Sequence, residues 1–131
     1  MAARTVPARD VGYSVKQCLA KRIGFGDGAT GVVTVGVLPP KALVTAVSVA
    51  ITTAFNAGTT NTLNLGTAAD ADGFASAIPT GTAGLIAADD LATSDDLYAT
   101  AEVTVTATHA QSGTAATVGA GIVCVEYVVV G

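Results

Sequence analysis

The sequence is poor in the residues from which catalytic sites and membrane spans are usually built. Its 131 residues include no tryptophan and a single histidine, and only 5% are aromatic and 12% charged. One histidine cannot form a histidine-based metal cluster within one chain. The most hydrophobic stretch, residues 120–130, contains Glu126 and is shorter than the roughly 18–20 apolar residues of a membrane helix. We therefore expect no membrane contact and no histidine-based metal centre.

The chain is built instead from small and β-branched side chains. Half of the residues are hydrophobic, and Ala, Val, Thr and Gly supply most of the bulk, which favours strands and turns over helices. A chain of this length is most simply one domain. Because small side chains bury little area each, the mean hydropathy of +0.58 favours an oligomer or a shell component over a free monomer.

Positive charge is confined to the first third of the chain. Six basic residues and two acids lie within the first 41 positions, a net charge of +4, whereas the remainder has eight acids and no base. This pattern is typical of a solvated acidic surface with a basic N-terminal strand, or of an N-terminal arm that docks on an acidic neighbour or on its own body. The acidic body argues against nucleic-acid binding, because phosphate contacts need clustered cations. The basic residues are Arg4, Arg9, Lys16, Lys21, Arg22 and Lys41.

The two cysteines, Cys18 and Cys124, could meet if the first and last strands pair. Residues 1–14 are basic but lack the apolar core of a signal peptide, which indicates synthesis in the cytoplasm with no visible export route. In a reducing compartment, two cysteines are more often buried thiols than a bridge. The sequence thus favours buried thiols, with the disulfide as the alternative.

Residues 42–66 contain the clearest signal of secondary structure. Turn-forming residues at 55–61 separate an alternating apolar run from Leu63 and Leu65, which start a returning strand. This order predicts a long hairpin in the middle of the chain. The period of two in the first run is that of a strand with one buried face, which would hold Leu43, Val47, Val49 and Ile51.

Further strands are predicted on both sides of this hairpin. They lie at residues 17–25, with Cys18, Ile23 and Phe25 as candidates for burial, at Val32–Leu38, with Val33, Val35 and Val37 on one face, at Gly84–Ala87, at 97–109, and at 118–130, with Val123, Val125, Tyr127 and Val129 on one face. A single helical turn is expected at residues 70–78. With about six to eight strands, we predict an all-β domain at residues 16–131, an antiparallel β-sandwich of jelly-roll type, preceded by an extended arm at residues 1–15.

Three short motifs could carry chemistry, and each has a simpler explanation. Residues 26–31 spell G-x-G-x-x-G, but the pattern runs into a strand and not into the helix of a dinucleotide site, so a hairpin turn is expected. Asp70 and Asp72 resemble the start of a calcium loop, yet no Glu follows until Glu102. His109 could serve a Ser/His/Asp triad, but no serine stands on a strained elbow. We therefore predict no enzyme, no catalytic residue, no metal site and no cofactor.

The middle of the chain resembles a run found in small structural proteins of tailed bacteriophages. That run has an alternating V-x-x-V-x-V strand, a T-T/A-F-N-x-G-T turn, T-L-x-x-G-T, and an Asp-rich D-x-D-x-(F/Y). Here these fall at residues 44–49, 53–59, 62–67 and 70–74. The segment YATAEVTVTATHAQSGTAATVGAGIVCVEYV, residues 98–128, is similar to the closing pair of strands in the same family.

The proteins that the chain resembles are capsid decoration, or cement, proteins and related phage head proteins. The resemblance implies a compact jelly roll or sandwich on the exterior of the virion capsid, made in the host cytoplasm. It implies two partners, the phage major capsid protein and further copies of the chain in a dimer or trimer, with the decoration protein bridging and stabilising its neighbours. The alternatives are a head fibre or receptor- or glycan-binding module, and a tail or neck connector component. We expect the acidic residues 89–96 to face solvent and the capsid contact to be made by Arg4, Arg9, Lys16, Lys21 and Arg22.

Overall fold

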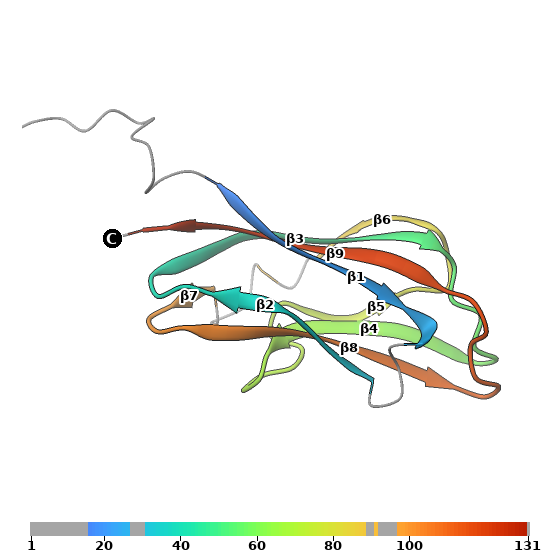
Figure 1. Ribbon diagram of the computed structural model, residues 1–131. Coiled ribbons are helices and arrows are strands. Elements are labelled where there is room, and N and C mark those ends of the chain that lie inside the picture. Colours follow the sequence, from blue (N-terminus) through green and yellow to red (C-terminus); the bar gives the residue numbers. More distant parts are fainter. Residues whose placement is uncertain (1–15, 27–30, 89–90, 92–96, 131) are drawn as a thin grey trace, which may run out of the picture.

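The computed structural model describes residues 16–26, 31–88, 91 and 97–130. Within these residues the chain forms nine strands, arranged as two sheets that lie one above the other (Figure 1). The predicted arm at residues 1–15 lies outside the described residues, as do residues 89–96 apart from Leu91. The structural account therefore concerns the sandwich itself.

The two sheets are named here after their first strands. The β1 sheet has the order β1 (Gln17–Gly24), β9 (Ala120–Val129), β3 (Ala42–Thr53) and β6 (Gly84–Ala87), and the short β7 (Tyr98–Ala99) also pairs with β3. The β2 sheet has the order β2 (Val32–Leu38), β8 (Val103–Ser112), β4 (Thr60–Thr67) and β5 (Ala75–Pro79). Every pairing is antiparallel. Two strands, β2 and β6, have the predicted bounds.

The order of pairing is that of a jelly roll. With β7 set aside, β1 pairs with β9, β2 with β8, β3 with β6, and β4 with β5. The chain is therefore folded as one long hairpin with β4–β5 at its tip, and this hairpin is rolled so that its successive strand pairs alternate between the two sheets. The predicted fold class, an all-β antiparallel sandwich of jelly-roll type, is confirmed.

The predicted hairpin in residues 42–66 is wrong. Its two strands, β3 and β4, lie in different sheets. The connection between them crosses the edge of the sandwich and inserts Phe55, which is buried and whose backbone N–H donates to Thr80 O at 2.9 Å. Sheets pack about 10 Å apart, a distance that a tight hairpin turn does not span. Residues 27–30 of the hairpin turn predicted at 26–31 lie outside the described residues, but the strands on either side, β1 and β2, lie in different sheets and so form no hairpin.

Two register shifts account for the errors in the predicted buried faces. In β3, Val47, Val49 and Ile51 are buried as predicted, but a shift between Val44 and Ala46 moves Leu43 to the outward face. A bulge adds one residue to a strand, so side chains before and after it follow opposite parities. A shift in β2 between Thr34 and Gly36 likewise buries Leu38 and leaves Val37, which was predicted to share a face with Val33 and Val35, 44% exposed.

The core lies between the sheets and is lined mainly by Val, Leu and Ile. Val123, Val125 and Tyr127 of β9 are buried, as the alternation predicted. Phe25, another predicted core residue, is 45% exposed because it lies beyond the end of β1. The helical turn predicted at residues 70–78 is absent from this described segment. The buried ring of Phe74 and the bond from its N–H to Leu65 O, at 2.9 Å, hold the chain extended into β5 instead.

Candidate partner-binding edge strand

The predicted partner-binding residues that the structure describes gather on one strand. Arg4 and Arg9 lie outside the described residues. Lys16 immediately precedes β1, and Lys21 and Arg22 belong to it. All three side chains are exposed, and in the described part of the chain β1 pairs with β9 alone. The structure therefore brings three of the five predicted residues together on an edge strand of the sandwich.

β1 is fastened to the body by its apolar positions. It pairs with β9 over eight positions, from Gln17 opposite Tyr127 to Gly24 opposite Ala120. Ile23 is buried, and Leu19 packs across to β2, where a Cβ added at Gly36 would lie 3.1 Å from Leu19 Cδ2. The glycine at position 36 thus makes room for Leu19. Because Leu19 and Ile23 face inward, the alternation of the strand turns Lys16, Cys18, Ala20 and Arg22 outward.

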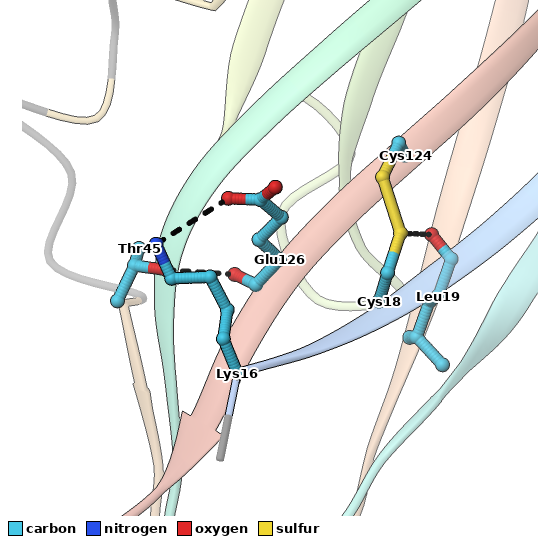
Figure 2. Close-up of a disulfide and its surroundings, with 6 residues drawn as sticks. All are labelled: Lys16, Cys18, Leu19, Thr45, Cys124 and Glu126. Carbon is cyan, nitrogen blue, oxygen red and sulfur yellow. Dashed lines mark hydrogen bonds and ion pairs between the residues drawn. A yellow bond between two sulfur atoms is a disulfide. The ribbon is translucent and has the colours of Figure 1, made fainter. Parts of the chain in front are cut away.

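Weak polar contacts add to this attachment at the start of β1. Lys16 Nζ lies 3.8 Å from Glu126 Oε2 (Figure 2). Both side chains are well exposed, so the ion pair contributes at most about 1 kcal/mol. Tyr127 OH donates to Gln17 Oε1 at 3.3 Å. Among the described residues, Lys21 and Arg22 have no acidic partner, so the edge keeps net positive charge.

A disulfide joins Cys18 of β1 to Cys124 of β9 on the outward face of the sheet (Figure 2). The prediction of two buried thiols is wrong: neither cysteine is free, and Cys18 is exposed. The pairing of the first and last strands is the reason. Cys124 lies directly opposite Ala20, one step along the same face from Cys18, and the two Cα atoms are 6.2 Å apart. In the prediction from sequence, pairing of these strands is the condition for a bridge. Buried thiols are favoured there because disulfides are rare in a reducing compartment.

His109, the one histidine, is a half-buried residue in the second half of β8, beside the core. Its ring lies 4.7 Å from that of Phe55, centroid to centroid, and its backbone N–H donates to Gly31 O at 2.6 Å. Burial lowers the pKa of His109 below the usual histidine value, and the buried Nε2 has no hydrogen-bond partner among the described residues. The small cavity beside the ring is apolar, which does not suit a general base, and is lined by Ile23, Gly24, Gly31, Val33, Phe55, Leu63 and Ala107.

The described residues offer little else that could hold a ligand. They contain no cluster of three or more His, Cys, Asp or Glu side chains that could hold a metal ion, and no helix with the length and apolarity of a membrane span. A hollow of about 450 Å³ is an open groove at one end of the sandwich. Tyr98 is its one aromatic lining residue and Glu102 its one carboxylate. No buried polar atom without a partner lies in the groove among the described residues.

Comparison with known proteins finds relatives through structure alone. No protein-family model and no curated protein sequence matches this chain. The fold is similar to a chain in the capsid asymmetric unit of cyanophage Pam1, with a TM-score of 0.72 and 21% identity over 98% of this chain and 95% of that chain. It is also similar to a chain of the acidic stable capsid of Helicobacter pylori bacteriophage KHP30, with a TM-score of 0.64 and 19% identity over 89% and 90% of the two chains.

A third likeness, to a chain in the capsid of Ralstonia phage GP4, has a TM-score of 0.63 and 17% identity, covering 98% of this chain and 92% of that chain. In all three cases the match extends over nearly the whole of both chains. At these identities the comparisons establish a shared fold. They do not carry residue roles from one chain to another.

Proposed function

We propose that the chain is a decoration, or cement, protein that binds the outside of an assembled phage head. The observation that carries this proposal is the whole-chain likeness to chains of three phage capsid structures. Residues 44–74 and 98–128 add the sequence resemblance to phage head proteins. A structural, non-enzymatic role also agrees with the chemistry of His109, whose ring faces apolar side chains.

In this role the protein bridges and stabilises neighbouring major capsid proteins. A ligand that binds the assembled lattice and not the separated subunits stabilises the lattice by mass action. The protein's partners are then the major capsid protein and further copies of the chain, as a dimer or trimer, and its location is the capsid exterior. The basic group Arg4, Arg9, Lys16, Lys21 and Arg22 contacts the capsid protein, and β1 holds the last three of these on a rigid strand.

The test is co-sedimentation of the purified protein with heads of its virus assembled without it. Saturable binding, with copies counted by quantitative mass spectrometry and matching the many equivalent positions of a symmetric shell, supports the proposal. Absence of binding contradicts it. Binding of about a dozen copies at one vertex contradicts it too, and favours a connector component, since a ring there has few equivalent positions.

A further inference from the structure

The outward faces of the two sheets differ in chemistry. That of the β2 sheet is largely hydroxylated, with Thr34, Thr62, Thr104, Thr106 and Thr108 facing solvent. That of the β1 sheet is largely small and apolar. One register row across it runs Arg22, Ile122, Ala50, Leu85, and the next runs Ala20, Cys124, Ser48, Ala87.

The apolar rows end in the most exposed large hydrophobic side chain of the described residues. Leu85, on the edge strand β6, is 76% exposed. Ile122 and Ala50 beside it are half-buried, and the next row adds only small side chains and the disulfide sulfur. A face of short side chains is flat, so a second protein surface can approach it closely and bury Leu85. We refer to these two rows as the docking face.

The charges around the docking face decide which partner it suits. Glu126 is the one acid on the outward side of the described β1 sheet, and Lys16 already contacts it. Arg22, at the end of the first row, has no acidic partner in the described residues, whereas Lys21, opposite the buried Val123, has the inward-facing parity of β1. In a second copy packed face to face, the described residues would bring no free carboxylate to Arg22, and the Arg22 side chains of both copies would stay unneutralised. The face therefore fits a different protein that brings carboxylates of its own.

We propose that the docking face binds a flat apolar surface of the assembled shell, with shell carboxylates opposite Arg22. This inference rests on the proposed function and adds to it the surface used and the chemistry of the site on the shell. The hydroxylated face of the β2 sheet then points away from the shell. Leu85 provides the apolar contact at one edge of the face, and the basic edge strand sets the orientation at the other.

The size of the face suggests a modest affinity for each copy. Four strands about 4.8 Å apart, over the four residues of β6 at about 3.3 Å each, cover about 20 Å by 13 Å, hence about 250 Å² per partner. That is below the size of stable specific interfaces, so a single contact is weak and reversible. Occupancy of the shell then depends on concentration and on contacts with neighbouring copies.

The test compares two variants of the face with a matched control on the opposite sheet. Leu85→Asp and Arg22→Glu should each raise the Kd for heads assembled without the protein by at least about tenfold. The first replaces a leucine that becomes buried on binding with a charged side chain, and the second reverses a charge at the interface. Val37→Asp, at an apolar residue on the outward face of β2 that is 44% exposed against 76% for Leu85, should leave the Kd within about twofold. Circular dichroism and thermal melting establish that each variant is folded.

The outcomes separate this inference from the function on which it rests. If the unchanged protein fails to bind heads, the decoration role itself fails. If it binds but Leu85→Asp and Arg22→Glu bind equally well, or if Val37→Asp alone loses binding, the docking face is wrong and the decoration role stands. Sedimentation velocity adds a further check: a change in the oligomeric state of free Leu85→Asp would assign the face to self-association and overturn the proposal.

Discussion

Reduction of the Cys18–Cys124 disulfide is expected to lower the free energy of unfolding by about 2–4 kcal/mol. The bridge joins residues 106 positions apart. For a loop of about 100 residues, the loss of chain entropy in the unfolded state corresponds to about 4.7 kcal/mol. Because unfolded chains are more compact than this model assumes, the value is an upper bound, and the smaller range is expected.

The folded state should change little on reduction. β1 keeps its eight paired positions with β9, and Ile23 stays buried. Cys18 is exposed, so separating the sulfur atoms opens no cavity in the core. The reduced protein is therefore expected to remain folded, with a far-UV circular dichroism spectrum like that of the oxidised form, and to lose stability through the unfolded state.

Urea denaturation with and without a phosphine reductant measures the effect. With a slope of about 2 kcal/mol per molar urea, the midpoint should fall by about 1–2 M on reduction. The double variant Cys18→Ser/Cys124→Ser should match the reduced protein and show no response to the reductant. A midpoint shift below about 0.3 M would refute the reasoning. So would alkylation of two thiols in the purified protein before reductant is added.

Three further outcomes follow from the burial of particular residues and from the predicted arm. Because burial lowers the pKa of His109, the unfolded chain binds a proton more readily than the folded chain as the pH falls below about 6.5. Stability in thermal melts should therefore fall below about pH 6.5, and His109→Gln should reduce that slope. Leu65→Ala should cost about 2–5 kcal/mol in urea denaturation, because Leu65 is fully buried, whereas Leu85→Ala, on the surface, should change stability by less than about 0.5 kcal/mol. Deletion of residues 1–15 should weaken binding to heads while the melting temperature stays the same, and full binding by the truncated protein would show that the arm is not needed.

The strands could be predicted from sequence because one face of each strand is buried. Val123, Val125 and Tyr127 alternate with outward residues over the whole of β9, and the structure buries all three. Strong turn signals such as Pro39-Pro40 also marked where β2 ends. Alternation reports that a strand has a buried side. It does not report which strand lies next to it.

The alternation of side chains therefore could not predict which strands pair or where the β-bulges lie. The residues after β3 favour a reversal, and they do reverse the chain, but β3 pairs with β9 and β6 instead of its neighbour β4. A register shift such as the one between Val44 and Ala46 leaves no signature in composition, although it decides that Leu43 faces outward. Pairing between distant strands depends on the whole fold, which a local window does not contain.

The candidate site was predictable in part, because charge can be counted without a fold. The clustering of cations before position 42 pointed to the N-terminal region, and Lys16, Lys21 and Arg22 do lie together. The strand predicted at residues 17–25 already contained Lys21 and Arg22, but the sequence did not reveal that this strand lies at an edge of its sheet, nor that Leu85 lies at the far edge of the same sheet. Arg4, Arg9 and the acidic residues 89–96 lie outside the described residues, and their roles stay predictions.

The position of the basic strand in the roll links folding of the chain to its ability to bind. In the described residues β9 is the one strand that pairs with β1, and the two are separated by about a hundred positions, as Cys18 and Cys124 are by 106. Such non-local pairing carries a large entropic cost that is recovered only when the rest of the sandwich is in place. Arg22, Ile122, Ala50 and Leu85 come from four strands spread along the chain. A partially folded chain therefore lacks the docking face, and only the complete sandwich presents its apolar rows beside its basic edge.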